Sequence, residues 1–124
     1  MKKTNLLKKV SCLLNQDYDC EVPFEKASKS VGRLLRSEIK KICKENNYNL
    51  LKDSINYGYY SCFISNGNKI IYINIGDYRF YNNFGLNEIL YREAENIKDF
   101  RGKRNNLSDW DNLSKNLKKI FNEC

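Results

Sequence analysis

Positively charged, aromatic and amide side chains alternate along residues 78–106. This mixture can bind an anion or a stacked ring. The cations are Arg79, Arg92, Lys98, Arg101, Lys103 and Arg104. The aromatic residues among them include Tyr78, Phe80 and Phe100. Such groups hold phosphates and stacked bases, and they are also enriched at the hot spots of protein interfaces. The stretch predicts a binding surface and leaves open whether its ligand is a protein, a nucleotide or a nucleic acid.

The most concentrated part of this stretch is the segment 98–106. Gly102 permits a tight turn in which backbone amides face a ligand. Arg101 and Arg104 can each make paired contacts with a phosphate or a carboxylate, and Asn105 follows them. An ordinary polar connection has a similar composition, but loops often carry binding residues. Upstream, Asp77 and Arg79 alternate along an extended segment, which predicts a structural ion pair that Arg92 can join.

A second group of cations is predicted to share one face of a helix. Its members are Lys29, Arg33, Arg36, Lys40 and Lys44. Steps of four, three, four and four residues place them together, opposite the apolar stripe. Such a row can follow a phosphate backbone or an acidic protein groove. A solvated helix face often has the same pattern. Glu38 and Glu45 are the acidic residues nearest to it in the sequence.

Catalytic chemistry is poorly represented in the chain. The sequence has no histidine, which removes the commonest general base and the commonest metal ligand. It also lacks paired carboxylates within one motif and the glycine-rich phosphate-binding motifs. We therefore expect no enzyme activity, no metal and no cofactor. The cysteines have no CxxC spacing; Cys12, Cys43 and Cys62 lie in apolar patterns and are predicted to be buried thiols in a reducing compartment.

The overall composition favours a negatively charged partner. The 124 residues carry a net charge of +7, and the sequence pI is about 9.1. This length allows one domain with a modest core. No apolar run is long enough to cross a membrane, and Lys8 and Lys9 interrupt the apolar stretch near the N-terminus. We therefore predict that the protein remains in the cytoplasm, without membrane contact. Whether it forms a homo-oligomer is left open by the composition.

The hydrophobic pattern predicts helices at both ends of the chain. The first is expected over Thr4 to Asn15 and the second from Pro23 to Asn46, with Gly32 as a possible bend or break. A final helix is expected over Asp109 to Asn122, capped by Ser108 or Asp109.

A period of two predicts strands between these helices. The expected strands are Tyr48 to Lys52, Tyr59 to Ser65, Lys69 to Ile75 and Ile89 to Ala94. Asn66-Gly67-Asn68 supplies the positive φ that a tight hairpin needs. The tyrosines of these strands fit either a stacking platform or the core. The expected fold is a single α+β domain with two N-terminal helices, a small antiparallel sheet and one C-terminal helix.

Four segments resemble a group of short proteins encoded by phages and mobile elements of low-GC Gram-positive bacteria. The resembling segments are Ser30 to Asn46, Tyr72 to Phe80, Ile89 to Ala94 and Lys98 to Asn105. The chain has Glu93 where the group usually has threonine and Lys103 where it usually has a second glycine. The resemblance implies no catalytic activity. Small phage-borne proteins of this size are often inhibitors of bacterial immunity, including anti-CRISPR proteins and traps for cyclic nucleotide signals.

Three functional hypotheses follow. The leading one is an inhibitor that binds a bacterial defence protein or ribonucleoprotein through the basic helix and the turn around Gly102. The second is a trap for a nucleotide second messenger, in which Arg92, Arg101 and Arg104 hold phosphates and Tyr78 or Phe80 stacks on a base. The third is a winged-helix regulator of nucleic acid, which requires that Gly32 splits the second helix and that Asn66-Gly67-Asn68 forms the wing tip.

Overall fold

The computed structural model describes residues 3–19, 24–76, 78, 86, 88–99 and 105–122. Within these residues the elements follow the order α1 (Lys3–Asp19), α2 (Phe24–Asn46), β1 (Asn49–Asn56), β2 (Tyr59–Ser65), β3 (Ile70–Gly76), β4 (Ile89–Ala94), β5 (Asn106–Ser108) and α3 (Trp110–Phe121). The predicted α+β fold is confirmed, with helices at both ends and the strands between them.

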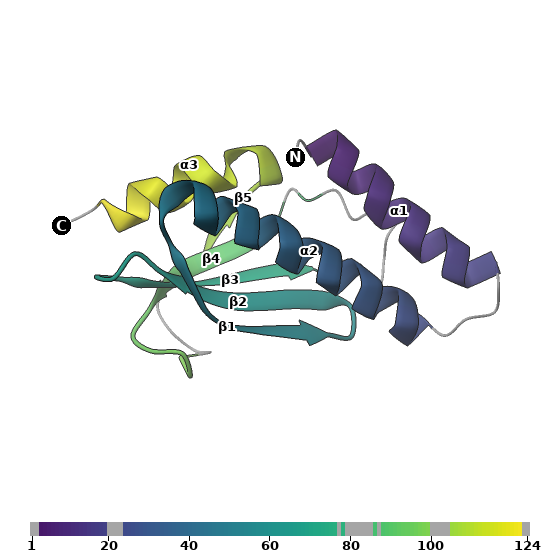
Figure 1. Ribbon diagram of the computed structural model, residues 1–124, viewed down its shortest axis with the longest axis horizontal. Helices are drawn as coiled ribbons and strands as arrows, with labels where there is room; N and C mark the ends of the chain where they lie inside the picture. Colours follow the sequence, from purple (N-terminus) through teal and green to yellow (C-terminus); the bar gives the residue numbers. More distant parts are fainter. Residues whose placement is uncertain are drawn as a thin grey trace.

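The strands form one antiparallel sheet in the order β1-β2-β3-β4-β5, so each strand pairs with its neighbour in sequence. The three helices lie on the same face of this sheet (Figure 1). Helix α2 contacts β1 and β2, α3 contacts β4 and β5, and α1 packs against α2. Because β1 is the first strand in this order, one of its two edges has no neighbouring strand among the described residues.

Helix α2 continues through Gly32 without a break. A Cβ atom at Gly32 would lie 2.3 Å from Cγ2 of Ile55 in β1, so the glycine lets the helix approach the sheet closely. The helix stops at Asn46; Asn47 has a φ of 60°, and the Tyr48 amide donates to the Cys43 carbonyl at 2.9 Å. The predicted stop is therefore confirmed. The winged-helix arrangement is wrong, because it required α2 to be split at Gly32.

The hairpin between β2 and β3 forms at the predicted residues. Gly67 has a φ of 99°, and the Asn66 side-chain oxygen accepts from the amides of Asn68 and Lys69, both at 2.9 Å. The hairpin belongs to a five-stranded sheet, in which β3 also pairs with β4. It is therefore an internal part of the fold and does not form an isolated wing.

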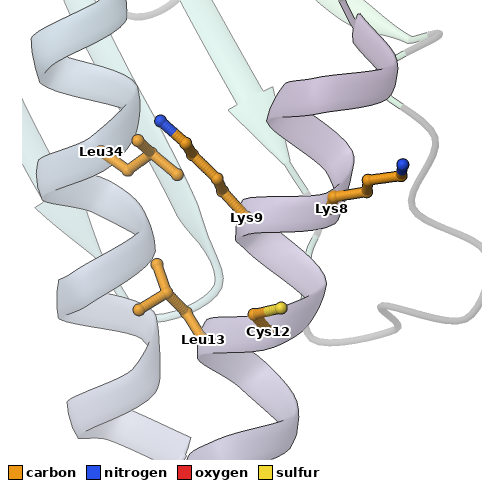
Figure 2. Close-up of a pocket in the computed structure, with 5 residues that line it drawn as sticks. All are labelled: Lys8, Lys9, Cys12, Leu13 and Leu34. Atoms are coloured by element: carbon orange, nitrogen blue, oxygen red, sulfur yellow. The ribbon is translucent and has the colours of Figure 1, made fainter.

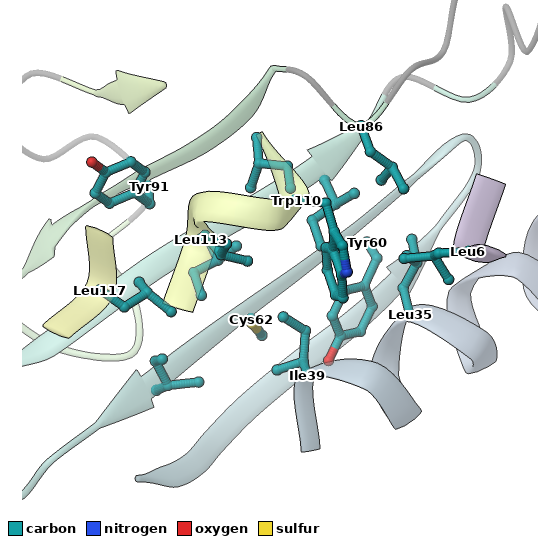
Figure 3. Packing of buried hydrophobic residues seen from close by; sticks show 14 of the residues in the cluster. Leu6, Leu35, Ile39, Tyr60, Cys62, Leu86, Tyr91, Trp110, Leu113 and Leu117 are labelled. Carbon is teal, nitrogen blue, oxygen red and sulfur yellow. The ribbon is translucent and has the colours of Figure 1, made fainter. Parts of the chain in front are cut away.

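The core lies between the helices and the sheet (Figure 3). Leu6, Leu35 and Ile39 come from the helices and pack with Trp110 over Tyr60. In β3, buried residues alternate with half-buried ones, as expected when one face of the sheet is covered, whereas Tyr60 to Ser65 of β2 are all buried. The cluster of buried residues also includes Val10, Ala27, Val31, Cys43, Cys62, Ile64, Ile71, Ile73, Ile75, Tyr78, Leu86, Ile89, Tyr91, Leu113, Leu117 and Phe121.

Several predicted boundaries differ from the structure. Helix α1 extends to Asp19, four residues past the predicted end, and β1 extends to Asn56. Strand β5 was not predicted, because three residues are too few to show a period of two. Strands β2 and β4 and the cap of α3 were predicted correctly; Asp109 Oδ1 accepts from the Asn112 amide at 3.0 Å. No helix among the described residues has the length and apolarity needed to cross a membrane.

Candidate binding surface on helix α2

Helix α2 contacts β1 through residues spaced four apart. The Ser28 hydroxyl donates to the Asn56 carbonyl at 3.0 Å, Gly32 faces Ile55, and Arg36 binds Asp53. This line of contacts fixes both the height and the rotation of the helix above the strand. Lys40 and Lys44 follow Arg36 at the same spacing of four residues along the helix.

Arg36 is held in place by a network that reaches into the core. Its Nε donates to Asp53 Oδ2 at 2.5 Å and its Nη2 donates to Oδ1 at 3.1 Å. The buried Tyr60 hydroxyl donates to the same Oδ2 at 2.9 Å. The hydrogen bond to Asp53 raises the pKa of Arg36 above its ordinary value, although burial opposes this effect. The guanidinium therefore stays charged and oriented. The predicted β1 ended at Lys52, so no partner was predicted for Asp53.

The remaining cations of the predicted row are exposed. We call Lys29, Arg33, Arg36, Lys40 and Lys44 the α2 basic row. Arg33, Lys40 and Lys44 are solvent-exposed, and the Arg36 side chain retains 36% exposure. Among the described residues, the ion pairs involve none of Arg33, Lys40 and Lys44. The structure thus brings the row together on one side of α2.

Glu38 lies away from this row and is buried. Only 3% of it is exposed, and its Oε2 accepts from Lys41 Nζ at 3.0 Å. The sequence placed Glu38 near the row without showing its direction. Asp53, rather than Glu38, is the acidic residue that binds Arg36 of the row. Most of the positive charge of the row therefore remains available at the surface.

The outer edge of β1 lies beside the α2 basic row. The Arg36, Gly32 and Ser28 contacts place this side of α2 directly above the strand. Within the described part of the chain, β2 alone pairs with β1. A register shift between Leu50 and Lys52 marks a bulge, and Leu51 at this bulge is 44% exposed. This edge was not among the predicted sites.

Arg92 was predicted to bind an anion, and this prediction is wrong. The residue is 3% exposed. Its Nη2 donates to the Asp99 carbonyl, its Nη1 lies 3.6 Å from Asp99 Oδ2, and its guanidinium lies 4.8 Å from the centre of the Tyr72 ring. Tyr72 in turn contacts Phe63, with ring centroids 5.0 Å apart. Arg92 therefore holds the segment after β4 against the sheet face opposite the helices.

Tyr78 was predicted to stack on a ligand, and this is also wrong. It is fully buried, and its hydroxyl donates to the Ser28 carbonyl at 3.4 Å. Tyr60 is likewise in the core, whereas Tyr57 and Tyr59 are exposed near the β1–β2 turn. Asn105 is exposed. Arg79, Phe80, Phe100, Arg101, Gly102 and Arg104 lie outside the described residues, as does Asp77.

The cysteines divide into two environments. Cys43 and Cys62 are buried, as predicted. Burial raises the pKa of the Cys43 thiol to about 11 and also raises that of Cys62. Both are therefore protonated and poor nucleophiles at neutral pH. Cys12 was predicted to be buried and is exposed, because Leu6 and Val10 occupy the core-facing side of α1. No group of three or more metal-binding side chains occurs among the described residues.

An open groove runs between α1 and α2 (Figure 2). It has a volume of about 360 Å³ and is lined by Lys8, Lys9, Cys12, Leu13 and Leu34. Lys9 and Leu13 extend toward Leu34 on α2, whereas the Lys8 amine points away (Figure 2). The groove is apolar and lacks the convergent polar groups that fix a small ligand. The groove is therefore a weaker candidate for a binding site than the α2 basic row.

Comparison with known proteins adds no assignment: no family model matches the chain, and neither the curated proteins nor the solved structures include a match.

Proposed function

We propose that this protein is a non-catalytic binding protein of the host cell cytoplasm that inhibits a bacterial defence complex. It binds a negatively charged protein or ribonucleoprotein surface through the α2 basic row. The observation that carries this proposal is the exposure of Arg33, Lys40 and Lys44 on one side of a helix that is fixed to the sheet.

The physical basis is electrostatic steering followed by oriented contact. The net charge of +7 attracts an acidic partner from a distance. Arg36 is already oriented by Asp53, so less side-chain freedom is lost when a carboxylate or phosphate binds beside it. Helix α2 itself carries seven lysines and arginines against three glutamates, which concentrates the attraction on this element.

The test uses a variant that changes the surface but spares the Arg36 network. Arg33→Glu, Lys40→Glu and Lys44→Glu together reverse the exposed cations. A matched control replaces Lys115, Lys118 and Lys119, which are exposed on α3, with glutamate. These three substitutions lower the net charge by the same amount as those on α2. Each protein is expressed in bacteria that carry different defence systems, and phage plating efficiency is measured. Affinity capture from the same lysates, with and without nuclease, identifies the bound component.

The wild type and the α3 variant are expected to restore plating in a strain whose defence complex they capture, and the α2 variant is expected to lose both properties. Capture that survives nuclease treatment indicates a protein or a protected ribonucleoprotein. Equal capture by the α2 variant and the wild type would show that the α2 basic row does not contribute to binding. Failure of the wild type to restore plating in every strain tested would contradict the inhibitor function.

A further inference from the structure

The outer edge of β1 lies beside helix α2, and Arg36 of the α2 basic row joins the two elements. Strand β1 has eight residues and, within the described chain, β2 is its only strand partner. On such an edge, alternate residues direct their backbone N–H and C=O groups outward. Arg36 is bound to Asp53 of this strand, so this member of the α2 basic row lies beside the strand that carries the outward backbone groups. A partner at this edge therefore meets hydrogen-bonding groups and positive charge together.

We infer that this edge binds an extended acidic segment of the target by strand addition. The segment pairs its backbone with β1 and directs alternate acidic side chains toward the α2 basic row. This inference rests on the proposed function, because it names the binding mode of the same surface. Strand addition is a common way for a sheet edge to bind a peptide, with backbone hydrogen bonds supplying affinity and alternate side chains supplying specificity.

The spacing of the cations agrees with an extended partner. Arg36, Lys40 and Lys44 are four residues apart along α2, which corresponds to a rise of about 6 Å per step. Side chains on one face of a strand repeat every second residue, at about 6.6–6.8 Å. An extended segment with acidic residues at every second position can therefore place successive carboxylates beside successive cations. A helical partner would present its own side chains at the same rise but could not use the β1 backbone groups.

A second copy of this chain is a poorer occupant of the edge. Pairing of β1 with β1 would place the two α2 helices next to each other on the same face of a joined sheet. The two basic rows would then meet, and each chain carries a net charge of +7. Like charges at such a contact oppose association.

The experiment uses three synthetic peptides as probes with the intact protein. The first has eight residues that alternate threonine and glutamate, which matches the length of β1. The second has the same composition with its glutamates in one block. The third has the alternating sequence with N-methyl groups on every second backbone amide, prepared in both possible phases. Binding is measured by fluorescence anisotropy, and hydrogen exchange is followed for the amides of β1 and, as an internal reference, β3.

The alternating peptide is expected to bind and to slow exchange in β1. The block peptide and one phase of the N-methylated peptide are each expected to bind at least about ten-fold more weakly, because one loses charge register and the other loses backbone hydrogen bonds. The α2 variant R33E/K40E/K44E should lose binding of the alternating peptide, and the α3 control variant should retain it.

Equal binding of the alternating peptide and both N-methylated peptides would overturn strand addition. Protection confined to α2, absence of any peptide binding, or formation of a dimer through β1 would overturn it as well. None of these results decides the proposed function, because the plating and capture experiments use the whole target and depend on the α2 charges alone. Loss of capture in the α2 variant, combined with equal binding of all the peptides, would leave the proposed function standing and reject this binding mode.

Discussion

Arg36 and Asp53 join the helical layer of this protein to the edge strand of its sheet, through hydrogen bonds of 2.5 Å and 3.1 Å. The pair is more than a surface ion pair, because the buried Tyr60 hydroxyl donates to the same carboxylate at 2.9 Å. Asp53 thus accepts from a core residue and from a member of the α2 basic row. Stability and the orientation of the proposed binding surface therefore depend on the same carboxylate.

Replacement of Asp53 by asparagine should destabilise the protein by about 1–2 kcal/mol, because one neutral amide oxygen cannot satisfy both Arg36 donors and the Tyr60 hydroxyl. Urea unfolding measures this change. Ser54→Ala is the matched control on the same strand; Ser54 is exposed, and its loss should cost less than about 0.5 kcal/mol. Equal stability of the Asp53→Asn variant and the wild type would show that the network contributes nothing.

Charge reversal should affect folding differently at Arg36 and at its exposed neighbours. The variant R33E/K40E/K44E should melt within a few degrees of the wild type, because these side chains are exposed and make no ion pair among the described residues. Addition of Arg36→Glu should lower the melting temperature clearly, since it places a second carboxylate beside Asp53. Circular dichroism follows both transitions. An equal melting temperature for the triple and quadruple variants would contradict the structural assignment of Arg36.

The sequence predicted the fold better than the site, for a physical reason. Periodicity reports which side of an element is buried, so it located β2, β4, α3 and the turn at Gly67. It also placed the α2 basic row on one face. It could not show what an individual polar side chain touches. Arg92 and Tyr78 have the residue types of a ligand site, yet Asp99, Tyr72 and Ser28 engage them inside the protein.

The edge of β1 is a candidate site that the sequence analysis did not predict. A strand becomes an edge through the order of the whole sheet, which no local pattern encodes. Gly32 is a second example. A glycine within a helical pattern predicts a less stable helix at that position. The structure shows instead that the missing side chain allows α2 to approach Ile55. In both cases the decisive information is a contact between segments far apart in the sequence.

Gly32→Ala should therefore destabilise the protein by about 1–2 kcal/mol, despite the better helix propensity of alanine. The added Cβ would lie 2.3 Å from Cγ2, 3.0 Å from Cγ1 and 3.2 Å from Cβ of Ile55, so a rotamer change of Ile55 cannot relieve every contact. In a background that contains Ile55→Ala, the same substitution should cost much less, because both γ carbons are gone. A double-mutant cycle by urea unfolding measures the coupling. Equal costs in the two backgrounds would exclude the proposed close approach.

Alkaline pH should destabilise the protein partly through Cys43. Burial raises the pKa of this thiol from 9.0 to about 11 in the folded state. The unfolded chain therefore loses this proton first as the pH rises. The contribution of Cys43 to stability is fully present below about pH 9 and is lost as the pH approaches 11.

The measurement compares the free energy of unfolding at several pH values between 8 and about 11 in the wild type and in Cys43→Ala. At pH 8 the alanine variant should have a lower free energy of unfolding than the wild type, because the substitution leaves a small cavity. As the pH rises to about 11, the free energy of unfolding of this variant should fall by about 1–3 kcal/mol less than that of the wild type. Burial also raises the pKa values of Tyr60 and Cys62, which act in the same direction and remain in both proteins. The difference between the two curves therefore reports Cys43 together with the part of the raised pKa values of Cys62 and Tyr48 that comes from the Cys43 charge. Parallel curves would mean that the thiol ionises as easily in the folded protein as in the unfolded chain, which is incompatible with its buried position on α2.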